Sequence, residues 1–148
     1  MAVGKVDFPK MQVVSGIKLG TCCAGVKQTE RDDVLLVEMA AESSCAAVFT
    51  QNAFCAAPVH LAKANLNGFD NTGTLRYLLV NTGNANAGTG EQGMLDAKLC
   101  CQAVADKVGV SADSILPFST GVIGELLPTA KITAVLDEAI SALKSDNW

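Results

Sequence analysis

The sequence predicts an α/β domain of the α+β kind, a layered sandwich of sheets and helices. Two apolar runs, Val34–Met39 and Leu75–Asn81, are short and typical of buried strands. The segment after Thr89 instead has apolar residues at helical spacing. Strands and helices mix without strict alternation, which favours layers over a doubly wound sheet. The 148 residues fit one domain, 1–148, with a modest core.

The first half of the chain is expected to be mainly extended. Val13–Ile17 is a short extended run, and Val34–Met39 is a nearly continuous apolar strand. Ala46–Thr50 is predicted to be the partner of that strand. Ala56–Lys63 alternates loosely, which favours another strand, and Ala64–Gly73 is rich in asparagine and glycine, which predicts a loop.

The second half carries clearer helix signals. Thr89 and Gln92 match a capping box, and Gly109 supplies a left-handed stop. The apolar face between them comprises Met94, Ala97, Cys101, Val104, Ala105 and Val108. Ser111–Ser114 is a second capped turn.

The last two predicted elements follow that turn. Ile115–Phe118 is predicted to be a strand at a sheet edge, because Pro117 cannot donate a ladder hydrogen bond. Pro128 can begin a final helix. Its buried face would comprise Ile132, Val135, Leu136, Ala139 and Leu143.

Charge and hydropathy exclude some classes of function. The net charge is −4 and lysine and arginine form no cluster, which argues against a nucleic-acid partner. No apolar run approaches a membrane span, and the first ten residues lack the apolar core of a signal peptide. We therefore expect a cytoplasmic protein. Only 18% of the residues are charged, which suggests that part of the surface is buried against a partner.

The six cysteines are expected to be reduced and mostly buried. Two pairs are adjacent in sequence, no C-x-x-C occurs, and there is no secretion signal. A metal site is not expected, since the spacing is irregular and His60 is the one histidine. His60 is interpreted as a structural strand residue, and Asp32–Asp33 as a solvated turn. A thiol enzyme that uses one of the cysteines stays open as an alternative.

Two polar, glycine-containing junctions could carry chemistry. N-T-G-N-A-N (Asn81–Asn86) and S-T-G-V-I-G (Ser119–Gly124) each follow an apolar run. A glycine there lets a bare backbone N–H point at a developing negative oxygen, and a threonine hydroxyl can add a second donor, as an oxyanion hole requires. The alternative is two turns capped by asparagine and threonine side chains. The residues alone leave both open.

Four ordered segments carry a resemblance to a known family. They are G-I-K-L-G…A-G-V-K (Gly16–Lys27), A-A-V-F-T-Q-N…A-P-V, L-V-N-T-G-N-A-N-A-G-T-G-E-Q-G and S-T-G-V-I-G-E-L-L-P. Together they resemble the ornithine acetyltransferase family, also called the ArgJ family, from about Val14 to about Leu143. The third and fourth segments are long and specific.

The resemblance implies an acetyltransferase of arginine biosynthesis. Family precursors cleave themselves before a threonine, which becomes the nucleophile at the start of a β chain. Acetyl passes from N-acetylornithine to that threonine and then to glutamate, a ping-pong route. The resemblance implies no cofactor, although some members take acetyl-CoA as donor. It also implies a DmpA-like fold with interleaved α and β chains, in an α2β2 heterotetramer or larger.

The resemblance assigns the oxyanion hole to Thr120 and Gly121. The Thr120 hydroxyl and the Gly121 N–H would stabilise the tetrahedral oxyanion. Asn81, Asn84 and Asn86 would tie down their loop through side-chain–backbone bonds. Lys27 could face a substrate carboxylate or be a surface lysine, and it is not assigned to the site.

One departure affects the expected activity. The cleavage segment of the family, around N-M-A-T-M-L, does not occur in this sequence. The chain is therefore expected to be an N-terminal fragment of the α chain, inactive alone and active with the β chain. The alternative is a non-catalytic small-molecule binding or interaction domain of the same fold.

Overall fold

The structure is a computed structural model that describes residues 10–27, 30–68 and 75–148. Four strands form one sheet in the order β1-β2-β3-β4. β1 pairs with β2 and β2 with β3 in antiparallel fashion, whereas β3 and β4 are parallel. The strands are β1 (Ile17–Cys22), β2 (Val34–Met39), β3 (Tyr77–Asn84) and β4 (Ile115–Val122).

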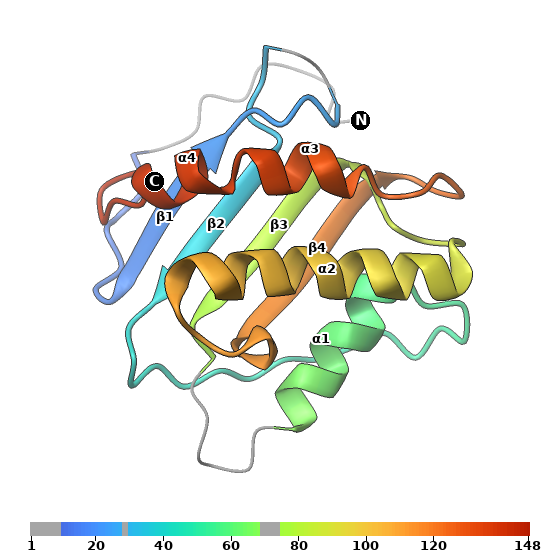
Figure 1. The fold of residues 1–148 in the computed structure, drawn as a ribbon. Helices are drawn as coiled ribbons and strands as arrows, with labels where there is room; N and C mark the ends of the chain where they lie inside the picture. Colours follow the sequence, from blue (N-terminus) through green and yellow to red (C-terminus); the bar gives the residue numbers. More distant parts are fainter. Residues whose placement is uncertain (1–9, 28–29, 69–74) are drawn as a thin grey trace.

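The helices gather mainly on one face of this sheet. Figure 1 shows α2 and the pair α3 and α4 crossing in front of the strands, with α1 beside β4. The helices are α1 (Ala57–Asn67), α2 (Gly90–Val108), the single 3₁₀ turn η1 (Ala112–Ser114), α3 (Thr129–Ala134) and α4 (Leu136–Ser141). Within the described ranges, none of them is long and apolar enough to cross a membrane.

The main core lies between the sheet and these helices. Alternate strand residues point into it, namely Cys22, Val34, Leu36, Tyr77, Leu79 and Ile115. The stripe predicted for α2 meets them, and Ala97, Cys101, Val104 and Ala105 are all buried. Gly109 ends α2 with φ +73°, as predicted. The α+β, layered architecture is confirmed.

The opposite face of the sheet is only partly covered. Leu116 packs there with Ala62 and Leu66 of α1 and with Phe49. The register aligns another row across all four strands, made of Thr21, Leu35, Val80 and Phe118. The first three of these side chains are half-buried, and Phe118 is 43% exposed. We call this row the open face.

Three predictions for the first half were wrong. Residues 46–50 form no strand, because β2 takes β1 and β3 as its neighbours. The segment predicted as the strand Ala56–Lys63 belongs to α1, which accepts Pro58 in its first turn, where no intrahelical donor is needed. Ala64–Asn67 continues that helix, and residues 69–73 of the predicted loop lie outside the described ranges. The first strand begins at Ile17, where the predicted extended run ends.

The second half follows the predictions more closely. β4 is an edge strand that contains Pro117, and Ser111 caps η1 by accepting a hydrogen bond from the Asp113 N–H. The final helix is divided into α3 and α4 at Val135, whose φ and ψ are −103° and 4°. The buried stripe of Ile132, Leu136 and Ala139 continues across that break.

Candidate active site at the carboxyl ends of β3 and β4

The two polar junctions found in the sequence lie side by side. Because β3 and β4 are parallel, their carboxyl ends meet at one edge of the sheet. The register there pairs Asn81 with Ser119, Thr82 with Thr120 and Gly83 with Gly121. A bulge at Asn84 ends the regular ladder. The carboxyl end of β1 and the amino end of β2 lie at the same edge, since both pair antiparallel with their neighbours.

Two glycines let the backbones approach closely at this edge. Gly121 has φ +140°, and a Cβ there would collide with the carbonyl carbon of Gly83. Gly83 has φ +106°, and its own Cβ would come within 2.9 Å of the Lys27 backbone nitrogen. Both positions therefore require glycine for space as well as for conformation. The segments around Lys27, Gly83 and Gly121 form three touching layers of backbone.

The Gly121 N–H lies on the outer edge of β4. Successive residues of a strand direct their N–H and C=O groups to alternate sides. The Val122 carbonyl accepts from Ala85 at 2.8 Å, so even-numbered residues face β3. The Ile115 carbonyl accepts instead from the Asn65 amide of α1, and Pro117 has no N–H, so odd-numbered residues face outward. The same alternation directs the Gly121 N–H away from the ladder.

Thr120 supplies a second donor next to this N–H. It follows Phe118 by two residues, so its side chain shares the open face. Thr120 and Gly121 are both exposed. Among the described residues, the Thr120 hydroxyl makes no hydrogen bond. A hydroxyl and a main-chain N–H on consecutive residues can together bind one oxygen that carries negative charge.

Three buried asparagines tie down the loop after β3. The Asn81 amide donates to the Asn84 carbonyl at 2.9 Å. The Asn84 amide donates to the carbonyls of Glu125 and Leu126, at 3.2 and 3.1 Å, and so joins this loop to the one after β4. Asn86 is fully buried and donates to the Gly93 carbonyl at 2.9 Å. The predicted role of these residues is confirmed.

The start of α2 differs from the predicted capping box. The Thr89 hydroxyl donates to the Asn86 side-chain oxygen at 2.8 Å and caps no backbone N–H. Gln92 donates to Asp96 at 2.9 Å, one turn along the helix. The Thr89 hydroxyl bonds to Asn86 instead of capping the helix because the buried side-chain oxygen of Asn86 needs a donor. The helix start is thus fixed to the candidate site through Asn86.

An apolar groove runs beside the site. Its volume is about 310 Å³, and it lies between β4, the first turns of α1 and residues 47–50. Phe118 and Ser119, the two residues before Thr120, belong to its lining. The Ser119 hydroxyl donates to the Asn81 side-chain oxygen at 2.6 Å, which fixes the strand at this point.

Asp33 is the residue at this edge whose importance the sequence did not show. The sequence pattern predicts a solvated turn here, but Asp33 is 3% exposed. Its carboxylate accepts hydrogen bonds from the backbone N–H groups of Ala24, Val26 and Lys27, at 2.7, 2.6 and 2.9 Å. Its neighbour Asp32 is exposed, as predicted. The signal for Asp33 is its place between a glycine-containing loop and a buried strand.

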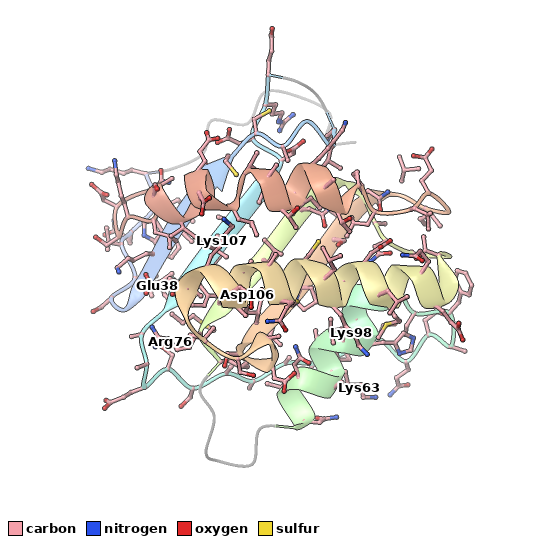
Figure 2. All side chains as sticks on the ribbon, viewed as in Figure 1. Glu38, Lys63, Arg76, Lys98, Asp106 and Lys107 are labelled. Atoms are coloured by element: carbon pink, nitrogen blue, oxygen red, sulfur yellow. The ribbon has the colours of Figure 1, made fainter. Side chains whose placement is uncertain are left out.

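Several other titratable groups have distinct surroundings. Glu38 and Arg76 form an ion pair at the opposite end of the sheet, 3.6 Å apart (Figure 2). His60 is exposed on α1 rather than on a strand. Burial raises the pKa of the Cys22 thiol to about 11 and the pKa values of Cys100 and Cys101 to about 12, so these three thiols are protonated at neutral pH. The described cysteines are reduced, and Cys45 is exposed rather than buried.

Proteins of known sequence match this chain along most of its length. The arginine biosynthesis bifunctional protein ArgJ of Methylococcus capsulatus is 58% identical over 135 residues, which cover 91% of this chain and 32% of that protein. The protein of the same name from Pseudomonas syringae is 52% identical over 148 residues, which cover 100% of this chain and 35% of that protein. The chain thus spans about a third of the length of these relatives.

Solved structures share the fold. The crystal structure of ornithine acetyltransferase complexed with ornithine, from Mycobacterium tuberculosis, superposes with a TM-score of 0.80 at 31% identity, covering 88% of this chain and 69% of that one. The arginine biosynthesis bifunctional protein of Bacillus halodurans gives a TM-score of 0.75 at 33% identity, covering 82% of this chain and 62% of that one. The model of the ArgJ family matches residues 18–147. The chain therefore belongs to the ArgJ family.

Proposed function

We propose that this chain is the oxyanion-binding part of an acetyltransferase that moves acetyl from N-acetylornithine to glutamate in arginine biosynthesis. The observation that carries the proposal is the pairing of the Thr120 hydroxyl, which bonds to none of the described residues, with an outward N–H on Gly121. Membership of the ArgJ family supports the reaction, since its relatives are named for arginine biosynthesis.

The proposed acetyl transfer uses the Thr120 hydroxyl and the Gly121 N–H as two hydrogen-bond donors to one carbonyl oxygen. The hydroxyl of a threonine on a separate β chain attacks the acetyl carbon of N-acetylornithine. The carbonyl oxygen becomes an anion that the Thr120 hydroxyl and the Gly121 N–H stabilise. The C–N bond then breaks, ornithine leaves with the proton taken from the threonine, and the acetyl-threonine ester remains. In the second half-reaction the amine of glutamate attacks the acyl carbon of that ester, and the same two donors stabilise the second oxyanion. The ester C–O bond then breaks and the threonine oxygen takes the proton from the amine, which gives N-acetylglutamate and free threonine.

We place the β chain over the open face of the sheet. Thr120 projects from that face, so a nucleophile must approach from it. The row of Thr21, Leu35, Val80 and Phe118 beside Thr120 is apolar enough to be covered by a second protein layer. A chain of 18% charged residues is consistent with such burial. An assembly with two copies of each chain follows from the family resemblance, and the proposal needs no cofactor beyond acetyl-CoA as a second donor.

The proposed function is tested with a chimera in which residues 1–148 replace the matching third of the Methylococcus capsulatus relative. Transfer of acetyl from N-acetylornithine to glutamate is measured before and after Thr120→Ala. Loss of one oxyanion donor should lower kcat about 100-fold, whereas Thr133→Ala on α3 should leave kcat unchanged. An inactive parent chimera, or Thr120→Ala with the rate of the parent, contradicts the proposal.

A further inference from the structure

We propose that Asp33 is a positioning residue of this site, holding the loop of residues 24–27 against Gly83 and thereby fixing Gly121. This inference rests on the proposed function, because it names how the oxyanion donors are kept in place. Asp33 touches neither the substrate nor the reacting atoms in this account. It acts through the backbone of residues 24–27 and the backbone of β3 at Gly83.

The first step is the capture of the loop by the carboxylate. The two Asp33 carboxylate oxygens accept hydrogen bonds from three backbone N–H groups of one short segment, those of Ala24, Val26 and Lys27, at 2.6–2.9 Å. Hydrogen bonds to an ionised carboxylate are short and roughly twice as strong as neutral ones. Lys131 adds a bond from α3 to the Gly25 carbonyl at 2.9 Å. The loop is therefore held from inside by a charge and from outside by a helix.

The second step transmits that position to Gly83. A Cβ at Gly83 would lie 2.8 Å from the Lys27 Cβ and 2.9 Å from the Lys27 Cα, so the two backbones are in direct contact. Asp33 also reaches the same strand through its own main chain, because its carbonyl accepts from the Thr82 N–H at 2.8 Å. Asp33 thus fixes β3 at Thr82 directly and at Gly83 through Lys27.

The third step links Gly83 to the two oxyanion donors, Thr120 and Gly121. Gly83 lies so close to Gly121 that Gly121 cannot carry a side chain, and Thr120 is paired with Thr82. A shift of the loop would move Gly83 and with it the outward N–H of Gly121. A misplacement of about 1 Å at a reacting centre can lower a rate about 100-fold. The backbone of Lys27 carries this contact, and the position of its exposed ammonium is not needed.

The first experiment compares Asp33→Asn with Asp32→Asn in the active chimera. The two variants lose the same charge at adjacent positions, but Asp32 is exposed and outside the loop contacts. Rates are referred to active sites counted from the acyl-enzyme burst, so a smaller folded fraction does not lower them. Asp33→Asn should lower kcat about 100-fold with KM for glutamate unchanged, and Asp32→Asn should change neither.

A second pair covers the case in which Asp33→Asn does not fold. Gly25 and Gly109 have φ values of +68° and +73°, and a Cβ at either meets no atom of the described residues within 4 Å. Alanine should lower the melting temperature similarly at both, but Gly25→Ala should also lower kcat about tenfold because it bends the held loop. Equal kcat within both pairs overturns the role of Asp33. If Asp33→Asn is unfolded, equal kcat within the glycine pair alone overturns it. Either result leaves the proposed function standing. An inactive parent chimera overturns both.

Discussion

At the scale of single residues, Gly121 is where the candidate site depends most on a missing side chain. Its φ of +140° and its contact with the Gly83 carbonyl exclude a Cβ. At Gly124, with φ +84°, a Cβ would meet nothing within 4 Å in the part of the chain that the structure describes. We expect Gly124→Ala to lower the free energy of unfolding by about 1–2 kcal/mol and Gly121→Ala by about 3 kcal/mol or more, since overlap adds to the backbone strain. Urea unfolding measures both, and equal losses would contradict the contact.

Buried thiols give the chain a pH dependence on the alkaline side. The pKa values of Cys100 and Cys101 are raised to about 12 by burial, so the folded chain keeps these protons when the unfolded chain releases them. The free energy of unfolding should therefore fall as the pH rises from about 8.5, the ordinary thiol value, towards 12.

This pH dependence is measured by urea unfolding between pH 7 and 10. Replacing Cys100 and Cys101 together by alanine should flatten the dependence, and replacing the exposed Cys45 should not change it. A double variant with the slope of the parent would show that other groups cause the loss. The double replacement should not remove the activity of the chimera per folded molecule, because protonated, buried thiols such as Cys100 and Cys101 are poor nucleophiles.

At the scale of elements, the segments with strong local signals were predictable from the sequence. Val34–Met39 coincides with β2, and the amphipathic stripe and Gly109 define α2. Local pattern failed where tertiary contacts decide. Ala56–Lys63 alternates weakly, yet it forms α1 because Leu61 and Ala62 are buried against two different clusters. Nothing in Ala46–Thr50 itself shows that β1 and β3 already occupy both edges of β2.

The candidate site was predictable in part. Each glycine-containing junction is visible in the sequence, and the family resemblance selects Thr120 and Gly121 from them. Their adjacency to Asn81–Asn86 depends on the parallel pairing of β3 and β4, which strand signals alone do not determine. The role of Asp33 depends on three N–H groups that only the folded loop brings together.

The start of α2 gives a prediction at this scale. Asn86 is fully buried and its side chain bonds to Gly93 and Thr89, so Asn86→Ala removes both hydrogen bonds and leaves a cavity at the start of α2. We expect a loss of about 2–3 kcal/mol in the free energy of unfolding, measured in urea. The exposed Asn67 at the end of α1 is the matched control, with an expected change within about 0.5 kcal/mol. Similar effects at the two positions would rule out the network as the anchor of α2.

At the scale of the whole molecule, the sheet has one covered and one open face. α2, α3 and α4 cover the first (Figure 1), and the row of Thr21, Leu35, Val80 and Phe118 lies on the second. The proposed β chain occupies that second face. Val80→Glu should therefore prevent co-purification of the two parts when they are expressed together, because it buries an unpaired charge at their interface. Lys98→Glu on α2 (Figure 2) should not, and co-purification of Val80→Glu would place the partner elsewhere.

The proposed activity depends on Thr120 and Gly121 binding the oxygen that becomes anionic during acetyl transfer. Single-turnover formation of the acetyl-threonine ester from N-acetylornithine tests it most directly, since this step precedes product release. Thr120→Ala should slow ester formation about 100-fold while the Kd for N-acetylornithine stays that of the parent. Ester formation at the parental rate, or a loss confined to the Kd, would contradict the account.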